Sequence, residues 1–271
     1  MKTRMTGHGG LPRKIFATLL ASAMLLTGLA FAADNSIYID QTGDNSTISV
    51  TQDGTSNVVR GVQGVGTSNT TPAKIYGDGN QVSVSQVGAS NVLNLGIVRG
   101  SGTGTTGNTV NYSITGNNGL ASINLNNDGQ ATASGNAVDI QQSGNNASAR
   151  LAVTGDTNTI SVTTAGGNNN TYLGTVTGNS NSQTVSMTGG GGNGSTVTQT
   201  GDNNTASITT VGGSNSVSLA QSDGSHTTTI AANGSSNTFD IVQQGTAASN
   251  VFNYNSTSGS NNSITIRQNA R

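Results

Sequence analysis

Apolar and polar residues alternate along this chain in short segments, and each segment is followed by a glycine and an asparagine. The stretch Ile48-Ser-Val50-Thr-Gln52-Asp-Gly54-Thr-Ser-Asn57 is a full copy of the pattern apolar-x-apolar-x-Gln-x-Gly-x-x-Asn. Alternation over five residues puts the apolar side chains on one face of a short β-strand. The glycine permits a tight corner, and the asparagine tolerates the left-handed backbone region. Each copy therefore predicts one strand and one corner.

The copies recur at a nearly constant interval. The place that glutamine holds, called here the slot, recurs at residues 41, 52, 63, 86, 97, 142, 153, 164, 176, 187, 199, 210, 221, 232, 243, 256 and 268. Asparagine follows the slot by five places at residues 57, 91, 158, 169, 181, 204, 215, 237 and 261. Most steps are 11 or 12 residues, while residues 64–79 and 96–135 fit loosely. We expect about 20 copies, two of which form a rung of about 22 residues.

This repeat predicts an all-β fold, a β-solenoid of about ten two-strand rungs. Rungs stacked about 4.7–4.9 Å apart would form a rod roughly 45–50 Å long. Amide side chains at equal places in successive rungs can hydrogen-bond along the stack, as in cross-β ladders. The residues expected to form this self-assembly ladder are Gln41, Gln52, Asn57, Gln63, Gln86, Asn91, Gln142, Asn158, Gln199, Asn204, Gln221, Gln243 and Gln268. The ends of such a rod would present unpaired strand edges, so we expect copies to stack end to end into amyloid-like fibres.

The first 32 residues have the features of a secretory signal peptide. Basic residues open the segment, an apolar run from Ile15 to Phe31 follows, and Ala30-Phe31-Ala32 supplies the small residues that a signal peptidase reads. We expect cleavage between Ala32 and Ala33, so that residues 33–271 form the repeat domain. No second long apolar run follows. The sequence thus predicts a secreted chain that does not span a membrane.

Charge and composition exclude several classes of function. Without the signal peptide the chain keeps six Lys or Arg against eleven Asp, a net charge of about −5. The basic residues do not cluster, so we expect no nucleic-acid partner. The chain has no cysteine, which excludes thiol nucleophiles and thiolate metal sites. Because the carboxylates are scattered singly rather than paired, we expect no enzymatic activity, no cofactor and no metal site.

Single polar residues receive structural interpretations. His226 is the one histidine beyond the signal peptide, and we expect it on a surface loop. Asp44, Asp53, Asp156 and Asp202 flank the turn glycines. There they favour turns and oppose premature edge pairing. A calcium-binding solenoid would instead repeat every nine residues with aspartate in each copy, and this period is longer.

A monomeric secreted β-solenoid that binds ice or acts as an adhesin is the alternative to a fibre subunit. Thr-x-Thr stretches such as Thr196-Val-Thr198-Gln-Thr200 could form a regular hydroxyl array on a flat solenoid face. Along the sequence, these threonines do not recur in one register. The fibre subunit is therefore the favoured interpretation.

The repeat resembles that of the curlin family, the subunits of bacterial curli fibres. That family repeats Ser-x5-Gln-x-Gly-x-x-Asn-x-Ala-x3-Gln, and its central part is matched here by Gln52-Asp-Gly54-Thr-Ser-Asn57 and by Gln199-Thr-Gly201-Asp-Asn-Asn204. The resemblance implies a subunit that polymerises with itself on the cell surface, in biofilm formation and adhesion. It also implies a nucleator subunit and an outer-membrane secretion pore as partners.

Overall fold

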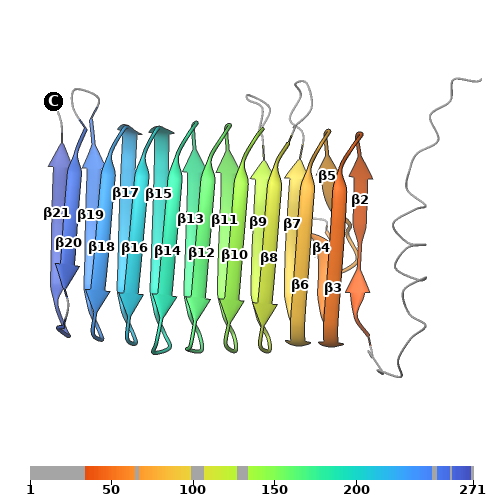
Figure 1. Ribbon diagram of the computed structural model, residues 1–271, viewed down its shortest axis with the longest axis horizontal. Coiled ribbons are helices and arrows are strands. Elements are labelled where there is room, and N and C mark those ends of the chain that lie inside the picture. Colours follow the sequence, from red (N-terminus) through yellow and green to blue (C-terminus); the bar gives the residue numbers. More distant parts are fainter. Residues whose placement is uncertain are drawn as a thin grey trace, which may run out of the picture.

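The alternating segments form strands whose inward side chains are apolar. In the strand Thr159–Ala165, Ile160, Val162 and Thr164 are buried, while the intervening residues are wholly or partly exposed. The computed structural model describes residues 34–64, 67–98, 107–126, 134–245, 249–256 and 258–269. The predicted signal peptide, residues 1–32, lies outside this part of the chain. Throughout the described residues the structure is all-β, and the strands pair in parallel (Figure 1).

The strands form two sheets. The nine-stranded sheet contains β3 (Thr47–Thr55), β6 (Gln81–Ala89), β8 (Thr109–Thr115), β10 (Ala137–Ser143), β12 (Thr159–Ala165), β14 (Ser182–Thr188), β16 (Thr205–Val211), β18 (Thr227–Asn233) and β20 (Val251–Ser256). The twelve-stranded sheet contains β1 (Ser36–Ile37), β2 (Ile39–Thr42), β4 (Val58–Gly61), β5 (Ala73–Tyr76), β7 (Val92–Val98), β9 (Leu120–Asn126), β11 (Ser148–Thr154), β13 (Thr171–Thr177), β15 (Gly194–Asp202), β17 (Ser216–Gly224), β19 (Thr238–Gln244) and β21 (Ser263–Asn269).

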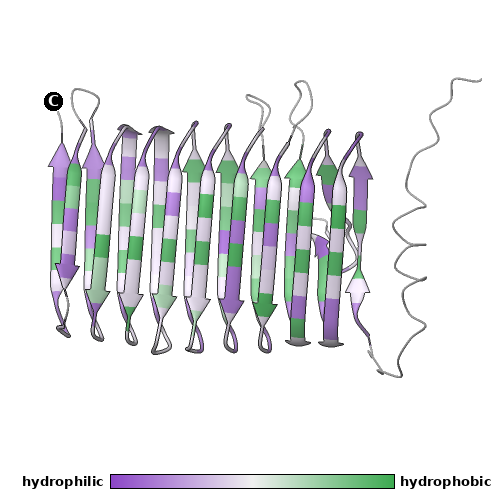
Figure 2. Ribbon diagram, viewed as in Figure 1, coloured by the Kyte–Doolittle hydropathy of each residue, from purple (hydrophilic) through white to green (hydrophobic). Residues whose placement is uncertain are grey.

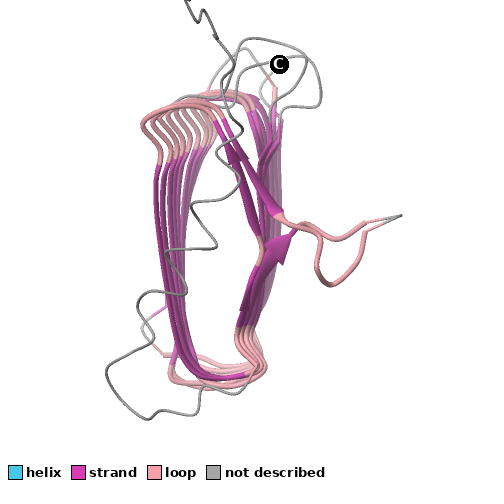
Figure 3. Ribbon diagram, turned by 90° about the vertical axis from the view of Figure 1, so that its right-hand side faces the viewer, coloured by secondary structure: helices cyan, strands magenta, loops and turns pink. Residues whose placement is uncertain are grey.

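Successive strands alternate between the two sheets, so one strand of each makes a rung. Val138 pairs with Ile160 and Ala149 pairs with Tyr172, offsets of 22 and 23 residues that match the predicted rung. The described strands make nine complete rungs after a leading half-rung, β1–β2. Viewed along the stack, the rungs superpose on one flattened outline (Figure 3). The predicted β-solenoid of about ten rungs is confirmed.

Insertions explain the two loosely fitting regions. Strands β4 and β5 are one strand interrupted by residues 62–72, so that Gln41 pairs with Ile75 at an offset of 34. The slot of this rung is therefore Ile75, and Gln63, predicted to hold it, lies in the insertion. In the second region the offset is 28 residues, and Ile97 pairs with Leu125. There the slot is held by Ile97 and Leu125 rather than by glutamine, so the repeat is not recognisable from the glutamine spacing.

The core runs along the stack between the sheets. Its side chains lie in columns in which each residue contacts its register partners, and Figure 2 shows the apolar positions at matching heights on neighbouring strands. In one column the inward residue is Gly174, and the side chain of Tyr172 fills the space beside it. A Cβ added at Gly174 would lie 2.0 Å from the Tyr172 hydroxyl oxygen, so a larger residue does not fit there. In the part of the chain that the structure describes, no helix has the length and apolarity needed to cross a membrane.

Candidate self-assembly site

Four glutamines of the twelve-stranded sheet form a continuous hydrogen-bonded ladder. The Nε2 group of Gln199 donates to Oε1 of Gln221 at 2.9 Å, Gln221 donates likewise to Gln243 at 2.9 Å, and Gln243 to Gln268 at 2.8 Å. Nε2 of Gln221 also donates to the backbone oxygen of Thr205 in the opposite sheet at 3.0 Å. The ladder therefore joins rungs to one another and also ties the two sheets together.

The same column holds aliphatic residues over its other half. Ile75, Ile97, Leu125, Val153 and Val176 follow one another in register before Gln199. At the boundary the Oε1 atom of Gln199 is buried with no hydrogen-bond partner. Amides and aliphatic groups are thus segregated along the column, which changes from one kind to the other only between Gln41 and Ile75 and between Val176 and Gln199. Segregation is favoured because an amide beside an aliphatic group can leave polar atoms unsatisfied.

The other predicted glutamines have different surroundings. Gln52 donates to Oε1 of Gln86 at 2.8 Å, a two-member ladder in the nine-stranded sheet. Gln142 accepts from the Tyr112 hydroxyl at 3.1 Å, and its Nε2 is buried without a partner. Gln41 donates to the backbone oxygen of Gly43 at 2.6 Å. Burial raises the pKa of the Tyr112 hydroxyl far above its usual range, so this hydroxyl remains a donor.

Two further ladders run along the corners of the solenoid. In each, the side-chain Oδ1 of one asparagine accepts the backbone N–H of the corner residue in the next rung, as between Asn136 and Asn158 at 2.9 Å. One column runs Ser46, Asn80, Asn108, Asn136, Asn158, Asn181, Asn204, His226 and Asn250. The other contains Asn35, Asn57, Asn91, Gly119, Ala147, Asn170, Asn193, Asn215, Asn237 and Asn262, and its side-chain ladder is interrupted at Gly119 and Ala147, which carry no acceptor. Corner amides are thus more continuous along the stack than slot amides.

Counting five places from the slot missed several corner asparagines. Asn80, Asn108 and Asn136 were missed because they follow insertions or irregular copies. Where the corner is one residue longer, the fifth place after the slot is Asn169 or Asn261, which has φ of +61° and precedes the ladder asparagine by one residue. Each buried corner asparagine instead stands two residues before the first inward residue of the next strand. Counting from the following strand would have found them, because an insertion does not change that distance.

A third set of contacts lies on the exposed rim of the corners. The carboxylate of Asp202 accepts the backbone N–H of Asn179 at 2.6 Å, and the Asn179 side chain accepts that of Asp156 at 2.7 Å. Asp156 and Asp202 therefore hold neighbouring turns together. Among the described residues, no three His, Asp, Glu or Cys side chains come close enough to bind a metal ion.

The repeat is also recognised by comparison with known families. The family model described as curlin associated repeat matches residues 31–54. Residues 31–54 are therefore recognised as a curlin associated repeat. This confirms the resemblance drawn from the sequence, and the described part of the matched segment contains the leading half-rung and most of β3. The curlin repeat family comprises structural fibre subunits, not enzymes. Neither the curated proteins nor the solved structures contain a match to this chain.

His226 takes the place of an asparagine in one corner of the solenoid, and its predicted location on the surface is wrong. The side chain is fully buried. Its Nε2 lies 2.8 Å from the Ser222 carbonyl oxygen, which can only accept, so Nε2 carries the hydrogen. Nδ1 then accepts the backbone N–H of Asn250 at 3.1 Å. The two ring nitrogens thereby reproduce the donor and the acceptor of an asparagine amide.

Replacing His226 with alanine is expected to destabilise the last rungs by about 1–3 kcal/mol, because the Ser222 carbonyl oxygen and the backbone N–H of Asn250 each lose their hydrogen-bond partner. His226→Asn is the matched control and should be tolerated, since its amide supplies both a donor and an acceptor. Hydrogen exchange of β20 and β21 at neutral pH, compared among the wild type and the two variants, measures the effect. Protection in His226→Ala equal to that of the wild type would contradict the assigned role.

Both ends of the stack present half-buried apolar side chains. Ile39, Ile48 and Val50 lie partly buried at the N-terminal end, and Phe252, Tyr254, Ile264 and Ile266 at the C-terminal end. Strands β20 and β21 each have one paired neighbour, as does β3. Such edges expose unpaired backbone groups. The candidate self-assembly site therefore consists of the unpaired strand edges and half-buried apolar side chains at the two ends, together with the amide ladders that reach them.

Proposed function

We propose that this chain is a secreted structural subunit that assembles with copies of itself into extracellular, curli-like amyloid fibres of a biofilm matrix and of surface adhesion. Residues 1–32 act as the signal peptide in this proposal, and residues 33–271 form the fibre subunit. A nucleator subunit and an outer-membrane secretion pore are further partners implied by the curlin family.

The observation that carries the proposal is that both ends of the stack leave backbone pairing and side-chain ladders incomplete, in a way that another copy can complete. The slot ladder is directional: Gln199, Gln221 and Gln243 each donate to the next glutamine toward the C-terminal end, where Gln268 is the last member. Parallel strands at both ends lack a neighbour on one side. A second copy whose strands run parallel to these edges extends the backbone pairing and buries half-exposed apolar side chains, each worth about 1.5–3 kcal/mol when fully buried.

Purified residues 33–271 are expected to polymerise after a lag phase and to give a meridional reflection at about 4.7 Å. Ile266→Lys places a charge in the inward column of the last strand, so it should abolish elongation while the monomer stays folded. Thr265→Lys, on the outer side of the same strand, is the matched control and should polymerise like the wild type. Sedimentation of fibres measures both. A wild type that remains monomeric at high concentration would refute the function.

One observation favours the alternative, a monomeric ice-binding module. On the outer face of the nine-stranded sheet, hydroxyl side chains occupy the same register on neighbouring strands. Threonine alone was expected not to recur in one register, but serine fills the remaining places of each column. On this face of β12, β14 and β16, three columns consist of hydroxyl-bearing residues in register: Thr159, Ser182 and Thr205; Ser161, Thr184 and Ser207; and Thr163, Ser186 and Thr209. Thermal hysteresis by a protein that forms no fibres would favour this alternative over the fibre subunit.

A further inference from the structure

The described strands make an odd number of half-rungs. Because β1–β2 and β4–β5 are each one strand interrupted once, the twelve-stranded sheet has ten layers and the nine-stranded sheet has nine. After β21, the alternation calls for a strand in the position of the nine-stranded sheet. The strands of the two sheets point in opposite directions (Figure 1), so a half turn about the stack axis places each sheet in the position and direction of the other. A following copy turned in this way supplies the missing strand with its own β1–β2.

Such a half-turn joint continues both sheets. The next copy's β1–β2 pairs with β20 and its β3 pairs with β21, both in parallel, and no strand position stays vacant. The strand registers set apolar side chains of the two copies face to face in the core: Ile37 of the next copy with Phe252, Ile39 with Tyr254, Ile48 with Ile264, and Val50 with Ile266. Every half-buried apolar side chain at the two ends is thereby covered.

A copy in the same orientation cannot continue both sheets. When β21 pairs with the next copy's β1–β2, one strand position stays vacant between β20 and the next β3, and the apolar side chains of these two strands face the gap. When β20 pairs with β3 instead, β1–β2 must leave its place and break the pairing of Ile37 with Val59 and of Gln41 with Ile75. The half-turn joint avoids both the exposed apolar surface and the broken pairing.

The glutamine ladder continues through the half-turn joint, where Gln268 faces Gln52 of the next copy. Nε2 of Gln268 donates to the backbone oxygen of Val251, the first residue of β20, at 3.2 Å. Nε2 of Gln52 donates in the same way to the backbone oxygen of Ser36, the first residue of β1, at 3.4 Å. The two amides therefore have the same orientation, and Gln52 donates onward to Gln86 at 2.8 Å. The joint extends the ladder from four members to six.

The other joints end this ladder. With β21 on β1–β2, Gln268 faces Gln41, whose Nε2 is turned to the backbone oxygen of Gly43 at 2.6 Å. With β1–β2 displaced, Gln268 faces Ile75, the register partner of Gln41. A tail-to-tail contact pairs β21 antiparallel with itself, so the strand end with Gln268 meets the strand start with Ile264. Of these joints, only the half-turn joint places a ladder glutamine beside Gln268.

Both corner columns also continue across the half-turn joint. Asn35 and Ser46 are the first members of their columns. In the joint, Oδ1 of Asn262 faces the backbone N–H of Ser46 of the next copy, and Oδ1 of Asn250 faces that of Asn35. These contacts repeat those within the chain, such as the one between Oδ1 of Asn237 and the backbone N–H of Asn262 at 3.1 Å. Each corner column is thus continued by the other corner column of the next copy.

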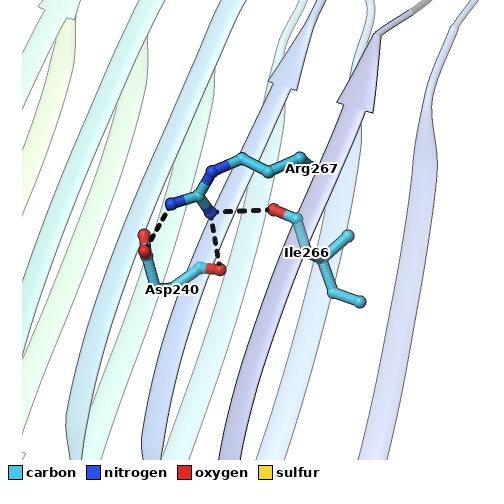
Figure 4. A network of polar contacts seen from close by, with 3 residues as sticks. All are labelled: Asp240, Ile266 and Arg267. Carbon is cyan, nitrogen blue, oxygen red and sulfur yellow. Dashed lines mark hydrogen bonds and ion pairs between the residues drawn. The ribbon is translucent and has the colours of Figure 1, made fainter.

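The charges on the outer face weigh little in this choice. The Arg267 guanidinium binds the Asp240 carboxylate at 2.5 Å and the Asp240 backbone oxygen at 3.1 Å (Figure 4). In the half-turn joint the next neighbour of Arg267 is Thr51, whereas with β21 on β1–β2 it is Asp40. The Arg267 side chain is 53% exposed, and an exposed ion pair contributes little to stability. A contact with Asp40 therefore does not compensate for a vacant strand position.

We propose that successive copies of this chain in a fibre are related by a half turn about the stack axis, with β1–β2 on β20 and β3 on β21. This inference rests on the proposed fibre function. Each copy advances the stack by nine and a half rungs, about 45–47 Å. The hydroxyl columns of β12, β14 and β16 then lie on opposite sides of the fibre in successive copies.

Engineered cysteine pairs test the joint, because the natural chain has no cysteine. Ser36, Thr47, Val251 and Ser263 are the first residues of β1, β3, β20 and β21. In the half-turn joint Thr47 lies beside Ser263, and Ser36 beside Val251, about 4.8 Å apart, within the range of a disulfide. In the same-orientation joints Ser36 lies beside Ser263, or Thr47 beside Val251. The same four positions, paired differently, therefore report each joint.

Fibres grown under reducing conditions and then oxidised are analysed on non-reducing gels. We expect most of the monomer band to shift to covalent multimers in two double variants, Thr47→Cys with Ser263→Cys and Ser36→Cys with Val251→Cys. The swapped pairs, Ser36→Cys with Ser263→Cys and Thr47→Cys with Val251→Cys, should stay monomeric. Disulfides within one copy are excluded, since paired positions lie at opposite ends of the stack, about 38 Å apart or more. Single-cysteine variants control for contacts between neighbouring fibres.

The outcomes separate the half turn from the fibre function. Multimers from a swapped pair, or from none of the four pairs, would overturn the half turn, while fibres of the cysteine-free parent still support the fibre function. Electron microscopy of parent fibres decides the question where a cysteine variant does not assemble. Successive subunits are expected to alternate by a half turn, and subunits that all face one way would overturn it. If the parent forms no fibres at all, both proposals fail.

Discussion

Replacing Gly88 with alanine is expected to destabilise the solenoid by about 2–5 kcal/mol. Gly88 has φ of +113°, and a Cβ there would lie 2.0 Å from the backbone oxygen of Gly116 in the next rung. The left-handed backbone costs an alanine about 1–2 kcal/mol, and the overlap with backbone adds about 1–3 kcal/mol. Hydrogen exchange of β6 and β8, together with chemical unfolding of the monomer, measures the loss.

Gly194→Ala is the matched control for this prediction. Gly194 also belongs to a strand, but a Cβ added to it would have no atom within 4 Å, and its φ is not in the positive range. Its register partners are Thr171 and Ser216, so a side chain suits the site. We expect a change of at most about 1 kcal/mol, toward greater stability. Equal destabilisation by the two substitutions would show that corner packing is not the cause.

Replacing Gln221 with alanine is expected to cost about 3–8 kcal/mol. Gln221 is 1% exposed and lies inside the glutamine ladder. Its loss removes the acceptor of Gln199 and the donor to Gln243. Truncation of a buried side chain of this size costs about 2–5 kcal/mol, and a partner left unsatisfied adds about 1–3 kcal/mol. Thermal and chemical unfolding of the monomer check the value.

Two controls separate the ladder from simple packing. Gln221→Met keeps most of the volume but none of the hydrogen bonds, so its cost measures the ladder itself. Ser218→Ala, on the exposed face of the same strand β17, should change stability by no more than about 0.5 kcal/mol. If Gln221→Met were as stable as the wild type, the amide ladder would contribute nothing to the monomer.

Fibre growth should depend on the ladder only where it reaches an end. Gln268 meets the next copy directly in the proposed joint, whereas Gln221 is enclosed between two rungs of its own chain. The assignment of Gln41, Gln52 and the other predicted residues to self-assembly stays a prediction.

Local chemistry made much of the fold readable from the sequence. Alternating side chains and a glycine at each corner are requirements of a single strand and turn, so they appear in every copy whatever its neighbours are. The slot at Gln199 and at Gln221 could be placed without knowledge of any contact, and these two residues are register partners.

Contacts between rungs were harder to predict, because they join residues 22 to 34 positions apart. The insertion 62–72 moved the slot from Gln63 to Ile75, since pairing follows the backbone register and not the residue count. His226 was misplaced because a lone histidine gives no periodic signal, and only its stacked neighbours Asn204 and Asn250 define its role.

The sequence by itself determined the strand, the corner and the rung, because each depends on side chains close together along the chain. Only the tertiary structure decided which amides meet, where aliphatic residues replace them, and that the two sheets end one layer apart. These depend on register accumulated over many rungs, where one insertion shifts every later contact between layers.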